Sequence, residues 1–156
     1  MARSLFVALC LALSACNTAP GKGAAMTSTY DPALAAKLGA DERGMRQYVL
    51  VILKTGPGDK IQGPERDKIF EGHFGNIARL TKEGKLLLAG PFSPNDKQYR
   101  GLFLFNTADK DEAARLVATD PAVVAGVFQF EIYPWYGSAA LMEAPVIHRR
   151  LEKPAP

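Results

Sequence analysis

Short apolar runs alternate with amphipathic stretches through the middle of the chain. We expect strands where these runs are rich in β-branched or aromatic residues and end at turn-forming residues, namely at residues 48–53, 85–89, 101–105 and 128–133. A helix is expected from Pro64 to just before Gly84, and a second helix over residues 109–119. This order predicts an α+β, ferredoxin-like βαββαβ domain, in which a four-stranded antiparallel sheet carries two helices on one face.

The expected sheet is apolar on both faces, which is unusual for a sheet with helices on one side only. In the first and third strands, large apolar residues occupy consecutive positions and therefore point both ways: Val49, Leu50, Val51, Ile52, Leu53, Leu102, Phe103, Leu104 and Phe105. Exposing such side chains to water forfeits about 1.5–3 kcal/mol each. We therefore predict a homodimer packed sheet to sheet, with the chain's own extensions, residues 30–46 and 137–153, as the competing cover.

The first residues are typical of an export signal. A single positive charge at Arg3 precedes an unbroken apolar run over residues 5–13, which as a helix would rise about 14 Å and is too short to span a bilayer. Leu13-Ser14-Ala15-Cys16 then resembles the lipobox of bacterial lipoproteins. The resemblance implies cleavage before Cys16 and lipidation of its sulfur. The alternative is an ordinary secretory signal that ends at the small residues before an incidental Cys16.

The chain is thus expected to have four parts. Residues 1–15 are the lipoprotein signal peptide, and residues 16–46 hold the lipidated cysteine, a flexible tether and a short helix. Asp31-Pro32 is a helix start and Gly39 a helix stop. The main domain covers residues 47–136, and residues 137–156 form a C-terminal tail with a helical stretch. The protein is expected to be exported to the bacterial cell envelope as a membrane-anchored lipoprotein that faces the periplasm.

Composition limits the partners and cofactors. Of 156 residues, 47% are hydrophobic and 22% charged, which suits a chain with a packed core, and a net charge of +3 is too small to indicate a nucleic-acid partner. Of the two cysteines, Cys10 is expected to leave with the signal peptide and Cys16 to carry lipid, so no disulfide is expected. His73 and His148 lie too far apart to give a helical pair of metal ligands, and no phosphate-binding glycine loop is present. We expect neither a metal nor another cofactor.

His73 is the main candidate for a functional residue. At 3.6 residues per turn it shares the inner stripe of its helix with apolar residues: Phe70, Phe74, Ile77 and Leu80. An imidazole aimed at the sheet needs a hydrogen-bonding partner. It is either a core histidine bonded to a backbone carbonyl or a functional group. Gly72 and Gly75 beside it are costly in a helix, so they suggest close approach of a neighbouring chain or a ligand.

Three segments of the chain resemble the YCII-related, or YciI-like, domain: residues 73–80, residues 83–91 with their Ala-Gly-Pro ending, and residues 120–127 with their Asp-Pro start. The resemblance spans about residues 47–136 and implies a dimeric α/β barrel. It also implies a catalytic His–Asp pair, carried over to His73 and Asp96, that performs general acid–base chemistry of a lyase, isomerase or hydrolase type. The implied partner is a small organic molecule.

Residues at the strand ends are candidates for binding that molecule: Lys54, Tyr99, Arg100 and Trp135. Lys54, Tyr99 and Arg100 together can recognise an anionic or phenolic ligand, although solvated charges are also common at strand ends. Trp135 either caps a pocket or closes the core. The alternative function is a non-catalytic module that binds a ligand or an envelope partner, in which His73 is structural.

Overall fold

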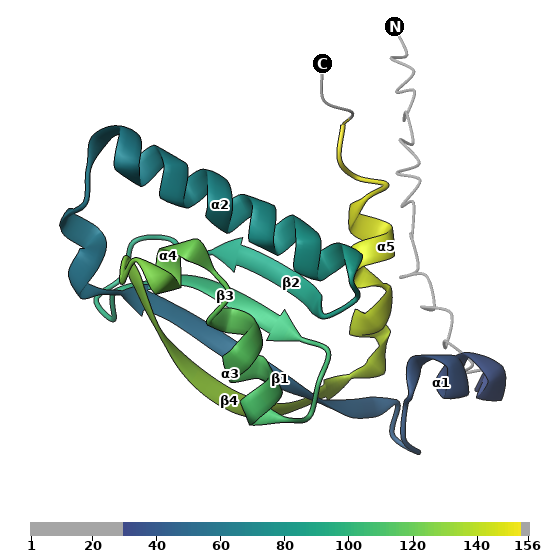
Figure 1. Ribbon diagram of the computed structural model, residues 1–156. Helices are drawn as coiled ribbons and strands as arrows, with labels where there is room; N and C mark the ends of the chain where they lie inside the picture. The colour runs from purple at the N-terminus through teal and green to yellow at the C-terminus, as the bar shows by residue number, and fades with distance from the viewer. Residues whose placement is uncertain (1–29, 154–156) are drawn as a thin grey trace, which may run out of the picture. The chain divides into compact units, whose positions relative to one another are not determined.

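The computed structural model describes residues 30–153, and its sheet has the expected antiparallel topology (Figure 1). The strands are β1 (Met45–Thr55), β2 (Leu86–Pro91), β3 (Tyr99–Phe105) and β4 (Phe128–Ser138). They pair antiparallel in the order β2-β3-β1-β4. α2 (Gly63–Lys82) connects β1 to β2, while α3 (Lys110–Val117) and α4 (Pro121–Val124) connect β3 to β4. The prediction of a ferredoxin-like α+β domain is confirmed.

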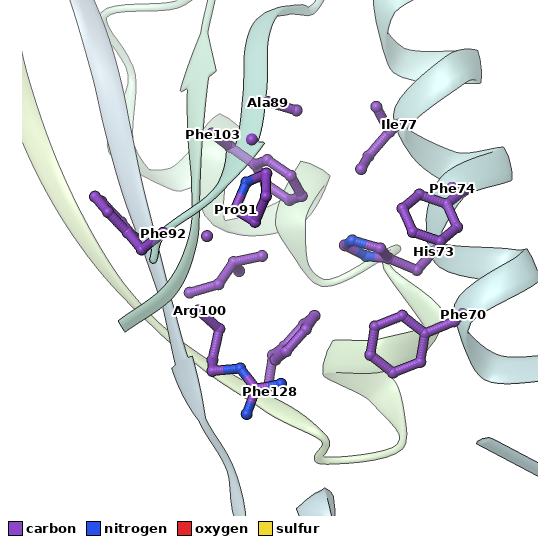
Figure 2. Close-up of a pocket in the computed structure, with 13 residues that line it drawn as sticks. Phe70, His73, Phe74, Ile77, Ala89, Pro91, Phe92, Arg100, Phe103 and Phe128 are labelled. Atoms are coloured by element: carbon purple, nitrogen blue, oxygen red, sulfur yellow. The ribbon is translucent and has the colours of Figure 1, made fainter. Parts of the chain in front are cut away.

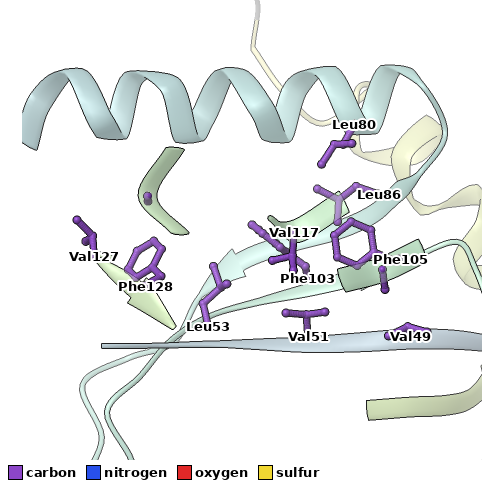
Figure 3. Packing of buried hydrophobic residues seen from close by; sticks show 12 residues of the cluster. Val49, Val51, Leu53, Leu80, Leu86, Phe103, Phe105, Val117, Val127 and Phe128 are labelled. Carbon is purple, nitrogen blue, oxygen red and sulfur yellow. The ribbon is translucent and has the colours of Figure 1, made fainter. Parts of the chain in front are cut away.

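The three helices cover one face of the sheet and enclose the main core (Figure 3). Alternate residues of β1 point towards them, and these are Val49, Val51 and Leu53. The core is completed by residues from every neighbouring element: Leu80, Leu86, Phe103, Phe105, Ala113, Val117, Ala122, Val127 and Phe128. The period of two along β1 therefore places one set of its apolar residues under the helices, as a half-buried strand requires.

The opposite face of the sheet is covered in part by the chain's own tail. β4 runs beyond the expected end at residue 133 and leads into the 3-10 helix η2 (Ala139–Glu143) and then α5 (Ala144–His148). Leu141 and Met142 of η2 pack on Tyr48, Leu87 and Leu104 at this end of the face. The competing expectation, cover by the C-terminal extension, is thus confirmed for one end of the sheet.

The tail does not cover this whole face within one subunit. Leu88 is 37% exposed, Tyr133 46% and Trp135 39%, and Leu50 and Leu102 are only partly buried. Such a group of large apolar side chains on one face suits contact with another surface. The predicted dimer is not tested by the structure of a single chain and stays a prediction.

The expected short helix before the domain is present as α1 (Pro32–Leu38). The carboxylate of Asp31 accepts hydrogen bonds from the backbone N–H groups of Ala33 and Leu34, and Gly39 ends the helix with a φ of 66°. Of the helices in the described range, none is long and apolar enough to cross a membrane. Cys16 and the predicted signal peptide lie outside the described residues.

Candidate functional site

His73 points from α2 towards the sheet, as its helical periodicity predicts. The residue is 7% exposed, and its imidazole is surrounded by the rings of Phe70, Phe74, Phe103 and Phe128. The ring centroids lie between 5.3 and 6.0 Å from that of the imidazole, with Phe103 stacked and the other three edge-on. A polar ring placed among four apolar rings must find a partner of its own, because water has little access to it.

That partner is Asp120. Nδ1 of His73 lies 2.7 Å from Oδ2 of Asp120, which is fully buried. The other carboxylate oxygen accepts a hydrogen bond of 2.9 Å from the backbone N–H of Ala122, because Asp120 is the N-cap of α4 and Pro121 its first residue. Since an ionised carboxylate only accepts hydrogen bonds, Nδ1 carries the proton of this contact, and in the neutral imidazole Nε2 is left as an acceptor.

A close helix contact brings the two residues together. Gly72 precedes His73 on α2 and packs against Pro121, and a Cβ added to Gly72 would lie 2.9 Å from Cγ of the proline. The missing side chain therefore lets the start of α4 approach α2 closely, which places Asp120 within hydrogen-bonding distance of the imidazole. Gly72 serves contact within the chain. Gly75, by comparison, has open space where a side chain would stand.

A pocket of about 440 Å³ lies on the exposed side of the imidazole, between α2 and the strands (Figure 2). Its size lies in the range of small-molecule sites. The walls are almost entirely apolar and include Phe70, Phe92 and Phe128. His73 and Arg100 contribute its polar side chains, and in Figure 2 the imidazole projects into the cavity from α2. Among the described residues the imidazole makes no hydrogen bond except that of Nδ1 to Asp120, so Nε2 is available to a ligand.

The predicted partner of His73, Asp96, is corrected to Asp120. Asp96 is exposed in the turn between β2 and β3 and does not line the pocket. Asn95 organises that turn, since its side chain bonds the backbone of Ser93, Lys97 and Tyr99. The turn composition predicted the turn correctly but gave no information on which side chain faces the helix.

Three of the four predicted substrate-binding residues do not line this pocket. Lys54 donates a 2.7 Å hydrogen bond to Glu131 on the opposite face of the sheet. Tyr99 pairs with Lys54 across the strands and lines a separate cavity, and the ring of Trp135 packs 5.8 Å from that of Tyr48. Glu131 connects Lys54 to Tyr133, because Tyr133 donates a further 2.7 Å hydrogen bond to the Glu131 carboxylate.

The fourth residue, Arg100, does line the pocket. The β1–β3 register shifts by one residue after the pair Leu53–Gly101, so that Lys54 pairs with Tyr99 and Arg100 has no partner in β1. Such a bulge re-aims a side chain. Across the described part of the chain, no group of three or more His, Cys, Asp or Glu side chains is placed to hold a metal ion.

The fold and the pocket define a ferredoxin-like α+β domain with a buried His–Asp pair at a small-molecule cavity. The YCII-related domain model matches residues 47–136, and the chain belongs to this family. The solved structure of 5-chloro-2-hydroxyhydroquinone dehydrochlorinase from Burkholderia phenoliruptrix AC1100, in complex with 2,5-dihydroxybenzoquinone, is similar at 21% identity and a TM-score of 0.43. The match covers 56% of this chain and 92% of that chain. No curated protein matches the chain.

Proposed function

We propose that the protein is an enzyme that uses His73 and Asp120 for general acid–base catalysis on a small organic molecule. The observation that carries the proposal is the buried 2.7 Å contact between Nδ1 of His73 and Asp120, with Nε2 facing a pocket of ligand size. This arrangement holds the imidazole in one orientation and one tautomer, as a general base requires.

In the proposed reaction, Nε2 of His73 takes a proton from the bound molecule and returns it at a later step. The Asp120 carboxylate stabilises the imidazolium that forms between these steps, because its negative charge lies next to Nδ1. The phenylalanine walls exclude water and strengthen this interaction. The His73–Asp120 pair in an apolar pocket suits proton transfer next to a carbonyl, in a lyase, isomerase or hydrolase reaction.

The test is turnover of the full chain on a panel of small hydroxy, oxo and halogenated acids and phenols, followed by two matched substitutions. His73→Gln should lower turnover about a hundredfold or more, because a positioned histidine contributes about 10²–10⁴-fold. His148→Gln is the control, since this second histidine is exposed in the tail and pairs with Glu152. Turnover that survives His73→Gln in a folded variant would remove the mechanism.

A non-catalytic module is the second candidate function, and the burial of the pair favours it. Asp120 is fully buried and caps α4, and His73 fills the space between four phenylalanines, so both residues also support packing. If this is their only role, His73→Gln should cost about 2 kcal/mol or more of unfolding free energy. Urea denaturation of this variant together with the substrate panel separates the two functions.

We propose in addition that the open part of the second sheet face packs against a second copy of the chain. The support is the group of exposed or half-buried apolar side chains on this face, with Leu88, Tyr133 and Trp135 as its most exposed members. A sheet face that meets its own copy forms a closed, two-fold assembly, because the same patch is used on both subunits. Sedimentation velocity that shows single subunits at all concentrations would contradict it.

We further propose that Cys16 carries lipid and anchors the protein in the cell envelope. The apolar run before Leu13-Ser14-Ala15-Cys16 and the polar, glycine-rich segment after it support this. Cys16→Ser should abolish incorporation of labelled palmitate and release the protein from the membrane fraction. Cys10→Ser is the control and should be labelled like the wild type. Labelling that persists in Cys16→Ser would contradict the proposal.

A further inference from the structure

The pocket beside His73 has a second polar group on its opposite side. Arg100 reaches the cavity from the strands, whereas His73 reaches it from α2 (Figure 2). Among the described residues no carboxylate lines this cavity, and every other lining side chain is apolar. The carboxylate of Asp120 is bonded to the far side of the imidazole and does not line the cavity, so the guanidinium is the charged group that a ligand meets, and it favours an anion over a cation.

The charge of Arg100 is not cancelled by its surroundings. Its nearest carboxylate is that of Asp59, with Oδ1 3.6 Å from Nη1 of Arg100, beyond the range of a hydrogen bond. The same oxygen lies 3.2 Å from Arg66, which is fixed there by two further hydrogen bonds to the backbone carbonyls of Asp59 and Ile61. Two guanidinium groups therefore share one carboxylate, and one positive charge remains at the pocket mouth.

The donors of Arg100 are also free. Among the described residues its side chain makes no hydrogen bond, and it is 38% exposed. The planar guanidinium can bind a carboxylate through two parallel hydrogen bonds, which gives a ligand a fixed orientation as well as affinity.

The remaining walls favour a flat ligand. Phe70, Phe74, Phe103 and Phe128 surround the imidazole and line the cavity. Aromatic faces and edges pack best against another planar π-system, with ring centroids about 4.5–7 Å apart. A saturated ring of the same size has no such contact to gain.

We infer that the pocket binds a small planar carboxylate, with the carboxylate on Arg100 and the conjugated body between the phenylalanines. The end of the molecule opposite the carboxylate then faces Nε2 of His73. The inference deepens the proposed function and rests on it for the role of Nε2. The binding itself depends on Arg100 and the pocket walls.

The test uses three commercial probes on the full chain: benzoate, its neutral amide benzamide, and the non-planar cyclohexanecarboxylate. The chain has two histidines, so carbon-detected imidazole signals are few, and His148→Gln identifies those of His73. Benzoate should shift the His73 signals and bind about tenfold or more tighter than benzamide. Cyclohexanecarboxylate should bind more weakly than benzoate. Failure of benzoate to shift His73 below about 50 mM would overturn the inference.

Substitutions at Arg100 then identify the group that binds the anion. Arg100→Gln should weaken benzoate about tenfold or more and remove its advantage over benzamide. Arg100→Lys, which keeps the charge, should retain part of that advantage. Arg115→Gln is the matched control, because Arg115 is an exposed arginine on α3 that does not line the pocket. Equal benzoate affinity in Arg100→Gln and the wild type would overturn the inference.

Failure of this inference and failure of the proposed function give different results. In calorimetry, His73→Gln should still bind benzoate, because the carboxylate lies on Arg100. If His73→Gln keeps full turnover while benzoate binding depends on Arg100, the catalytic proposal falls and the binding inference stands. If turnover requires His73 but benzoate binding does not depend on Arg100, the binding inference falls and the catalytic proposal stands.

Discussion

Asp120 has two neighbours, and each of its carboxylate oxygens bonds one of them. Oδ1 accepts from the backbone N–H of Ala122 and Oδ2 from His73. An asparagine in its place can keep the first bond through its carbonyl oxygen. Its NH₂ group, however, donates, so Nδ1 of the imidazole would have to accept and the proton would move to Nε2. The nitrogen that faces the pocket would then be unable to accept a proton.

Asp120→Asn should therefore lower turnover about a hundredfold or more and change the unfolding free energy by only about 1 kcal/mol. Asp109→Asn is the matched control, because Asp109 caps α3 in the same way through the N–H of Asp111 but is exposed and remote from the pocket. Steady-state kinetics and urea denaturation of both variants measure the two effects. Full turnover in Asp120→Asn would show that the tautomer of His73 does not matter.

The sequence predicted single residues unevenly. His73 was identified by helical periodicity, since its neighbours on the same stripe are apolar. Asp120 was visible only as the start of a segment that resembles the family, because burial of a capping residue depends on the tertiary contact that Gly72 allows. Asp96 was mistaken for its equivalent. The position of Arg100 depends on a one-residue register shift, and nothing in the residue types around it signals a bulge.

At the scale of elements, two glycines on α2 offer a matched comparison. Gly72→Ala adds a Cβ that would lie 2.9 Å from Cγ of Pro121, so α2 and α4 must move apart. We expect a loss of about 1 kcal/mol or more, since overpacking costs exceed the gain in helix propensity.

Gly75→Ala is the control three residues further along the same helix. Nothing lies within 4 Å of its added Cβ, so the substitution should stabilise the protein by about 1 kcal/mol. Thermal denaturation measures both variants, and imidazole spectra report whether Gly72→Ala also loosens the contact of His73 with Asp120. Equal stabilisation by both alanines would contradict the role assigned to the helix contact.

The order and type of the main helices and strands could be predicted from the sequence, because the spacing of apolar residues and the turn-forming residues are local signals. The end of β4 could not. The expected strand ended at residue 133, yet β4 continues through Pro134 to Ser138. β4 is an edge strand, so a residue without an N–H is tolerated there, and edge position is a property of the assembled sheet.

For the whole molecule, the central expectation is the dimer. Leu88→Arg places a charge on the open part of the second face, where Leu88 is 37% exposed in the single subunit, and should weaken dimerisation about tenfold or more. Val124→Arg is the control, because Val124 is 74% exposed on α4 at the helical layer. Sedimentation velocity over a concentration series compares them. Equal association of both variants would move the interface elsewhere.

The same face carries a charged group that links the dimer to pH. Hydrogen bonds from Lys54 and then Tyr133 hold the pKa of Glu131 below its ordinary value. A carboxyl group whose pKa is lowered in the folded protein stabilises the fold at pH values above its ordinary pKa. This contribution is lost as the pH falls through the lowered pKa. If the face is the interface, protonation leaves Lys54 uncompensated beside Tyr99 and Tyr133, and the dimer should weaken below about pH 4.

Glu131→Gln should reproduce the acid effect at neutral pH. Glu112→Gln is its control, because Glu112 also has a lowered pKa, caused by hydrogen bonds from Lys85 and Thr107, but lies at the start of α3. Sedimentation velocity at neutral and acid pH, with circular dichroism to confirm folding, measures both. Dimers that persist in Glu131→Gln would show that the Glu131 carboxylate does not stabilise the interface.

The most direct test of the site is the protonation of the His73 ring nitrogens, measured by nitrogen NMR of the imidazoles at about pH 9, where free imidazoles are neutral. The structure predicts a proton on Nδ1, held by Asp120, and an unprotonated Nε2 towards the pocket. Asp120→Asn should reverse this pattern. A wild-type spectrum with the proton on Nε2, or one unchanged by Asp120→Asn, would contradict the account.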